Sequence, residues 1–266
     1  MIKHYIAIFK YLSVKCLGVF VLAICVNSVS FYTHANEASM KKLIGEITKM
    51  YMSSMVYIFQ HQPLINGKTL DKSELQGDKF INNIKHIYRA KYNEEFPLSD
   101  HFAKQILLQA MIEVMDDNKP LLYDNEIDFK GIIPATFAFQ LSAKLATKGV
   151  GLKIKFTRTK DSIRNVLNIP DAWESVVMQK VIRRPQIYYD NNAVINGKPA
   201  IRQFTPLPMA PYCLACHGAP KDNPLNHNKK PADWTNIDMT GFKMENWTMD
   251  DFGGGVSISI EKAVLQ

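Results

Sequence analysis

The spacing of apolar residues changes near Gly149, and that change limits the fold more than any other feature. Before it, apolar side chains recur every three to four residues, which is typical of amphipathic helices. We expect helices over about 37–60, around 80–88, from a cap at Ser99 to about Val114 with Phe102 on the apolar face, and from Pro134 to just before Gly149. Residues 62–68 contain Pro63 and Asn66-Gly67 and are expected to form a turn.

After Gly149 the period becomes that of strands. Leu152, Ile154 and Phe156 alternate with polar residues, which predicts a half-buried strand. A short helix is expected from Pro170 to about Ile182, a hairpin over 186–206 turning at Asn196-Gly197, and a last strand over 255–260. Helices followed by neighbouring strands predict an α+β fold with an antiparallel sheet.

The first 35 residues have the pattern of an export signal. Lys3, Lys10 and Lys15 precede an apolar stretch over 16–32, and the small residue Ala35 follows. A basic start, an apolar core and a small final residue are typical of a secretory signal peptide. We expect cleavage after Ala35 and a periplasmic location. An uncleaved anchor is the alternative, because the apolar stretch approaches the length that spans a bilayer.

Removing this segment changes both the charge and the cysteine content. The formal charge falls from +7 to +4, and Cys16 and Cys25 are lost. The remaining basic pairs, Arg183-Arg184 and Lys229-Lys230, are too short to indicate a nucleic-acid surface. Two cysteines, Cys213 and Cys216, stay in the exported chain, too few for a disulfide framework.

Those two cysteines belong to Cys213-Leu214-Ala215-Cys216-His217, a C-x-x-C-H sequence. This is the attachment signature of c-type haem, in which two thiols bond to the haem vinyl groups and the histidine is the proximal iron ligand. A dithiol redox site would be expected in a βαβ context, which the sequence does not show. A zinc site would need four ligands, and only His227 lies near enough to contribute.

Several further segments, in order, resemble a bacterial family of exported haem-c domains with a PAS-like fold. They are residues 131–138, 155–158, 164–165, Pro170-Asp171-Ala172-Trp173-Glu174, 197–200, 213–218, 238–242 and 253–258. The family was long known as a domain of unknown function, and its members occur alone or as the sensing part of histidine kinases and chemoreceptors.

The resemblance implies a helical region over 36–130 that packs on a PAS-like sheet, and a haem-carrying region over 131–266. One covalently attached haem c is implied, with a sensing or redox role and no catalytic activity. In the best-known form of the family, a cysteine before the sheet is the distal iron ligand. This chain has none near Asp128–Gly131. By their chemistry the distal candidates are Met209, His61, His86, His101 and His227, and an open position would favour binding of a small gas.

The expected function is that of a sensor. The 231 residues that follow Ala35 serve one haem motif, more than a small electron carrier needs. We expect a redox or small-gas (NO, CO or O2) sensor that acts through a partner protein; the alternative is a periplasmic electron-transfer cytochrome c. Arg158 and Arg164 are candidate contacts for the haem propionates. The helix over 37–60 is a candidate homodimer contact, nucleic acid is not expected, and a membrane is expected only if the first segment stays uncleaved.

Overall fold

A computed structural model describes residues 37–97 and 101–265. The chain divides into two units, Met1–Leu43 and Ile44–Gln266, and each is considered by itself. Of the first unit only residues 37–43 are described; they begin a helix that covers residues 37–60. The predicted signal segment therefore lies outside the described residues, and the boundaries at 35 and 130 stay predictions. No helix within 37–97 or 101–265 is long and apolar enough to cross a membrane.

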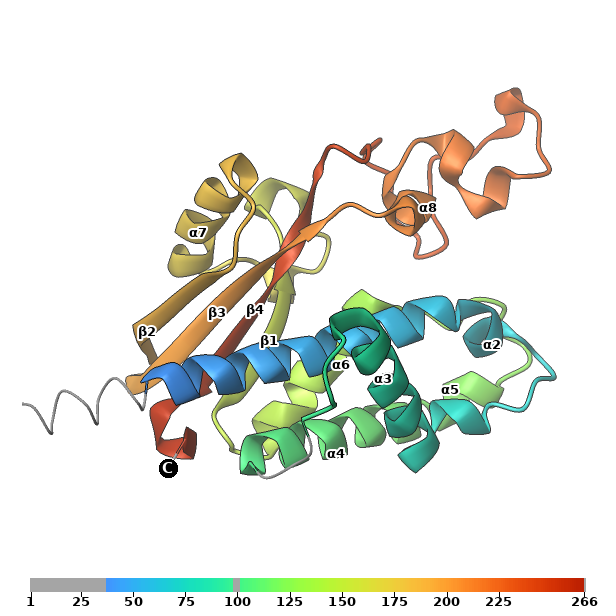
Figure 1. Cartoon of the computed structure of the whole chain (residues 1–266). Helices are drawn as coiled ribbons and strands as arrows, with labels where there is room; N and C mark the ends of the chain where they lie inside the picture. The colour runs from blue at the N-terminus through green and yellow to red at the C-terminus, as the bar shows by residue number, and fades with distance from the viewer. Residues whose placement is uncertain (1–36, 98–100, 266) are drawn as a thin grey trace, which may run out of the picture. The chain divides into compact units, whose positions relative to one another are not determined.

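The second unit contains helices followed by an antiparallel sheet, which confirms the predicted α+β class and the helical region before the sheet (Figure 1). After the helix that ends at residue 60, the elements are α2 (Gln62–Asn66), α3 (Gly77–Tyr92), α4 (Phe102–Asp117), α5 (Lys119–Tyr123), α6 (Pro134–Thr147), β1 (Leu152–Thr157), α7 (Ala172–Arg183), β2 (Tyr188–Ile195), β3 (Lys198–Pro208), α8 (Leu214–His217) and β4 (Phe252–Glu261). Short 3₁₀ turns lie between them.

The four strands are ordered β1-β4-β3-β2, and every neighbouring pair is antiparallel. β2 and β3 form the predicted hairpin. Its two turn residues, Asn196 and Gly197, both have positive φ angles (52° and 78°), as a tight two-residue turn requires. β3 and β4 are neighbours in the sheet, although residues 209–251 separate them in sequence. This connection carries the C-x-x-C-H motif and leaves and re-enters the sheet at one end (Figure 1).

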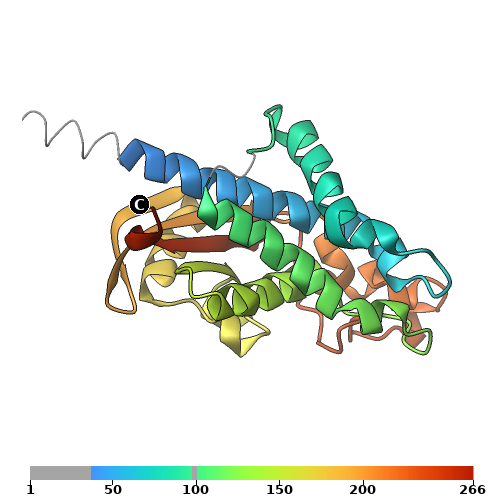
Figure 2. The ribbon, with the colours of Figure 1, turned by 90° about the horizontal axis from the view of Figure 1, so that it is seen from below.

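The two faces of the sheet differ in chemistry. One face is apolar, with Ile154, Ile201 and Ile258 fully buried, and it lies against the helical layer (Figure 2). Gln203 on this face donates to the Thr48 hydroxyl of the helix over 37–60 at 2.9 Å. The other face carries α7 over Phe204, which packs with Val177, Met178 and Val181. Alternation along each strand produces this division, because successive side chains point to opposite faces.

Three local predictions are wrong. Residues 62–66 form helix α2 rather than a turn, because Pro63 occupies the first turn of a helix, where a missing N–H is tolerated. α4 begins at Phe102 with His101 as its cap. The Nδ1 atom of His101 accepts a hydrogen bond from the Ala103 amide. The proposed cap, Ser99, lies outside the described residues. Phe102 is exposed and does not belong to the apolar face of α4.

The last strand begins three residues before its predicted start, at Phe252, so Gly253-Gly254-Gly255 lies inside the sheet. A Cβ atom on Gly255 would overlap the ring of the buried Phe204. Only a residue without a side chain lets the Phe204 ring pack here. All three glycines are part of β4, and Gly255 makes room for the Phe204 ring on which α7 packs.

We expect Gly255→Ala to lower the free energy of unfolding by about 1–3 kcal/mol, the usual cost of overpacking a core. Denaturant-induced unfolding followed by circular dichroism measures it. Gly45→Ala is the matched control: Gly45 lies in the helix over 37–60 and no heavy atom lies within 4 Å of a Cβ at this position. The free energy of unfolding of the Gly45→Ala variant should be unchanged or rise by up to about 1 kcal/mol. Equal stabilities of the two variants would contradict the packing argument.

Candidate functional site

The C-x-x-C-H motif forms a single helical turn in the connection between β3 and β4. Cys213 precedes α8, and Cys216 and His217 end it. Both thiols are free and partly buried. Three-residue spacing on one turn places both sulfurs on the same side of the helix. The motif therefore presents two thiols and an imidazole from one short segment, as the sequence predicted.

A carboxylate orients the imidazole of His217. The Nδ1 atom of His217 lies 2.9 Å from Oε2 of Glu245, and the Trp247 ring stacks on the imidazole with centroids 4.5 Å apart and planes 10° apart. The Trp247 amide also donates to the His217 carbonyl at 2.8 Å. A carboxylate on one ring nitrogen fixes the proton there and leaves the other nitrogen as a free electron pair for a metal. The arrangement suits His217 Nε2 as an iron ligand.

Arg164 joins the segments around the motif. Its Nε and Nη2 atoms donate to the two oxygens of Glu245 at 2.7 Å each, and Nη1 donates to Asp238 at 2.5 Å. Nη2 also donates to the Cys216 carbonyl at 3.0 Å. A bidentate pair of this kind sets orientation as well as distance. Arg164 therefore fixes the carboxylate that orients His217 and the backbone of the motif itself.

The carboxylates of this cluster stay ionised. Burial raises the pKa of Glu245, but hydrogen bonds from His217 and Arg164 outweigh it, and the pKa falls to about 2. The pKa of Asp238 is also lowered: burial raises it, and the bonds from Thr240 and Arg164 more than compensate. For Arg164, burial lowers the pKa, and the same two acids raise it above its usual value. Two ionised acids thus face one arginine beside His217.

The pKa values of the two thiols are raised, whereas those of the carboxylates are lowered. Burial raises the pKa of Cys213, and burial together with the charge of Asp238 raises the pKa of Cys216 to about 11. Dithiol oxidoreductases depend on a depressed thiol pKa, because the thiolate is the nucleophile. Within residues 37–97 and 101–265, no group of three His, Cys, Asp or Glu residues is arranged to hold a metal ion. Neither alternative weighed from the sequence, a redox dithiol or a zinc site, is favoured by this geometry.

The two arginines predicted as carboxylate contacts have different surroundings. Arg164 is already engaged by Asp238, Glu245 and the Cys216 carbonyl. Arg158 lies over the Trp247 ring, with Cζ 3.1 Å from the ring centroid, and its Nε and Nη1 atoms are buried without a hydrogen-bond partner. Burial lowers the pKa of Arg158 to about 10, despite the nearby charges of Asp251 and Glu245. Arg158 is the arginine with free donors for an added carboxylate.

The five distal-ligand candidates lie in different places. Met209 is buried and directly follows β3, four residues before Cys213. His61 follows Phe59, whose ring stacks on Tyr212 beside the motif at 3.6 Å, although the Nδ1 atom of His61 lies 2.8 Å from the Tyr57 carbonyl. His101 caps α4, and His86 and His227 are exposed. The distal ligand stays a prediction, with Met209 and His61 in the segments that adjoin the motif.

Sequence reasoning missed Glu245, Trp247 and the Phe59–Tyr212 contact. Glu245 lies 28 residues after His217 in a stretch with no periodicity, and no local spacing links the two. Asp238 belongs to a segment that supported the family resemblance, but nothing in the sequence gave it a partner. The only sequence signal was the resemblance of residues 238–242, which marks the segment without assigning a role.

We expect Arg164→Gln to destabilise the 209–251 connection by about 3 kcal/mol, because it leaves the buried Asp238 and the half-buried Glu245 without their cation. Hydrogen exchange read by mass spectrometry should show faster exchange over 213–218 and 238–247. Lys198→Gln is the control, since the Lys198–Glu261 pair involves an exposed lysine, and such pairs contribute less than about 1 kcal/mol. Unchanged exchange in Arg164→Gln would mean that the connection is held by other contacts.

Comparison with known proteins assigns the family. No curated protein matches the chain. A solved structure, described as the crystal structure of the cyanobacterial heme-protein Tll0287, aligns with 60% of this chain and 95% of its own, at 15% identity and a TM-score of 0.35. The profile of the family described as "Tll0287-like: Tll0287" matches residues 71–261, which include every segment on which the resemblance rested. The chain belongs to the Tll0287-like family, and the family expected from the sequence is confirmed.

Proposed function

We propose that this chain is an exported protein with a single haem c, attached through Cys213 and Cys216 and ligated by His217. The observation that carries the proposal is the C-x-x-C-H turn whose histidine is already oriented by a carboxylate, with Nδ1 of His217 2.9 Å from Glu245. Family membership and the expected export signal support it. Haem is joined to such motifs outside the cytoplasm.

The residues around the motif fit this group. Both thiols are free for thioether bonds, and the Nδ1 contact leaves Nε2 of His217 for iron. Arg158 has two buried nitrogen atoms without partners, and haem brings two propionate carboxylates. Burying an unpaired cation is costly, and a carboxylate would remove that cost. We assign the propionate contact to Arg158 and a supporting role to Arg164.

When bound, haem supplies a redox-active iron that also accepts small gases at an open position. The chain's own residues hold and tune it. The ionised Glu245 accepts a hydrogen bond from His217 and so makes the imidazole a stronger donor. Trp247 covers one face of the imidazole and limits its rotation. These contacts favour the oxidised iron, because added negative charge near the ligand stabilises the higher charge state.

A sensing role is favoured over electron transfer by how the motif is attached. It lies between two neighbouring strands, β3 and β4, and Arg158 and Arg164 follow β1. Tyr212 stacks on Phe59 near the end of the helix over 37–60. A change in iron charge or ligand would therefore act on residues that belong to the sheet and to the helix. The inferred role is redox or NO, CO or O2 sensing in the periplasm, with no catalysis, through a partner protein or a homodimer contact of this helix.

Covalent attachment has a direct test. We expect Cys213→Ala combined with Cys216→Ala to abolish haem that survives denaturation, because both thioether bonds are lost. Pyridine haemochrome spectra of protein coexpressed with a cytochrome c maturation system measure it. Leu214→Ala within the same turn is the control and should retain covalent haem. Covalent haem in the double variant would contradict the proposed function.

The sensing role is tested by carbon monoxide. If the distal position is open or weakly filled, CO should shift the Soret band of the reduced protein at micromolar concentration. Met209→Ala and His61→Ala separate the two adjoining candidates: the variant that removes a weak distal ligand should bind CO more tightly than the unaltered protein. A spectrum that CO leaves unchanged, in all three proteins, would exclude gas sensing and leave redox sensing or electron transfer, which potentiometry separates.

A further inference from the structure

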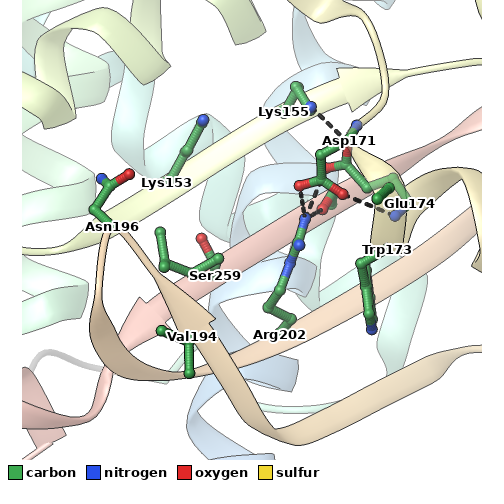
Figure 3. A pocket seen from close by; sticks show the side chains of 12 residues that line it. Lys153, Lys155, Asp171, Trp173, Glu174, Val194, Asn196, Arg202 and Ser259 are labelled. Carbon is green, nitrogen blue, oxygen red and sulfur yellow. Dashed lines mark hydrogen bonds and ion pairs between the residues drawn. The ribbon is translucent and has the colours of Figure 1, made fainter.

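A cavity lies on the polar face of the sheet, and residues 213–217 do not line it. It has a volume of about 360 Å³ and is lined by β1, the start of α7, the β2–β3 turn, β3 and β4 (Figure 3). α7 covers this face over Phe204, and the cavity occupies the part of the face nearer the Asn196 turn. None of its lining residues belongs to the 209–251 connection.

The side chains that line the cavity carry one more positive charge than negative charges. Glu174, which is buried, contacts Nζ of Lys155 at 2.5 Å and Nη2 of Arg202 at 3.0 Å. Arg202 also donates to Asp171 at 2.8 Å. Burial raises the pKa of Asp171, but hydrogen bonds from the Glu174 amide and Arg202 outweigh it, and the pKa is lowered, so the acid stays ionised. Two acids balance Lys155 and Arg202, and Lys153 is the remaining cation.

Three side chains that carry hydrogen-bond donors form a row across three strands. The strand register places Lys153 of β1 opposite Ser259 of β4, and Ser259 opposite Arg202 of β3. Residues directly opposite have Cβ atoms about 5 Å apart and point to the same face. Within residues 37–97 and 101–265, no hydrogen bond or ion pair is formed by the Lys153 ammonium or the Ser259 hydroxyl. Arg202 is only 7% exposed, and its Nε has no partner.

Apolar groups complete the cavity. Trp173 and Ala172 line it from α7, and Val194 and Ile195 line it from the end of β2 (Figure 3). The guanidinium of Arg202 lies 4.3 Å from the Trp173 ring, which holds both side chains in place. A site with aligned donors, a single excess positive charge and apolar walls favours an organic anion with one charge.

We propose that this cavity binds a small organic monocarboxylate, with its carboxylate on the row formed by Lys153, Ser259 and Arg202 and its apolar body against Trp173 and Ile195. Carboxylate oxygens accept from ammonium, hydroxyl and guanidinium donors, which are the three groups in this row. The site is independent of the haem motif, so the proposal goes beyond the proposed function and survives its failure.

Isothermal titration calorimetry of the full exported chain in 0.15 M salt tests the proposal, with benzoate as the probe. Benzamide has the same shape without the charge, and inorganic phosphate tests for a general anion site. We expect benzoate to bind at least about tenfold more tightly than either, since a charged hydrogen-bond partner is worth roughly that factor. Lys153→Gln should weaken benzoate binding by about tenfold, and Ser259→Ala should weaken it less.

Lys229→Gln is the matched control, because it removes an exposed lysine that lies outside the cavity and should leave benzoate binding unchanged. Lys153 is also exposed, so its substitution should not disturb folding. The proposal is overturned if benzoate does not bind at millimolar concentration, if phosphate or benzamide binds as tightly, or if Lys153→Gln behaves like Lys229→Gln. A benzoate-induced change in the haem spectrum that persists in Lys153→Gln would place binding at the iron and also overturn it.

Discussion

The geometry of the C-x-x-C-H site depends on one half-buried arginine. The connection over 209–251 contains only α8 and short 3₁₀ turns, so backbone hydrogen bonds of regular elements do not fix most of it. Arg164 contacts it at three separate places, through Asp238, Glu245 and the carbonyl of Cys216. A guanidinium has five donors in a rigid plane, which lets one side chain set the relative positions of several chain segments.

The segment that follows β1 supplies both arginines that reach the site. Arg164 acts on His217 through Glu245, and Arg158 acts on it through Trp247. Their electrostatic roles differ: Arg164 is compensated by two ionised acids, whereas Arg158 has two buried nitrogen atoms, Nε and Nη1, without a hydrogen-bond partner. Thus the first is suited to stabilise the protein without a ligand and the second to meet an added carboxylate. Both residues lie within seven positions of the end of β1. The chain therefore connects this strand of the sheet directly to the residues that reach the site.

One face of the sheet packs against the helices, and the other face borders the cavity. The apolar face is closed by the helical layer, as the buried Ile154, Ile201 and Ile258 require. On the polar face, α7 packs over Phe204 and leaves the row of Lys153, Ser259 and Arg202 beside a cavity. Strand alternation accounts for both faces together, because the polar residues of the row lie between the buried apolar residues of the same strands.

Local sequence patterns determined most of the secondary structure. The helical period, the alternation after Gly149, the Asn196-Gly197 turn and Pro134 each act over a few residues, and the structure follows them. Two errors were local, at Pro63 and at the cap of α4, and the others occurred where distant contacts decide. Phe102 is exposed despite its spacing, and Gly253 and Gly254, which precede the predicted last strand, belong to β4, where the backbone of Pro208 and of Thr157 leaves no room for a Cβ atom.

The same distinction applies to the sites. The sequence by itself determined the cluster of two thiols and an imidazole, since five consecutive residues on one turn contain all of it. Only the tertiary structure decided which groups surround it, because Glu245 and Trp247 are about 30 residues away and Arg164 more than 50. It also distinguished Arg158 from Arg164 and assembled the cavity on the polar face from four strands and a helix. The physical reason is that charge compensation and burial depend on neighbours in space, which a one-dimensional pattern does not contain.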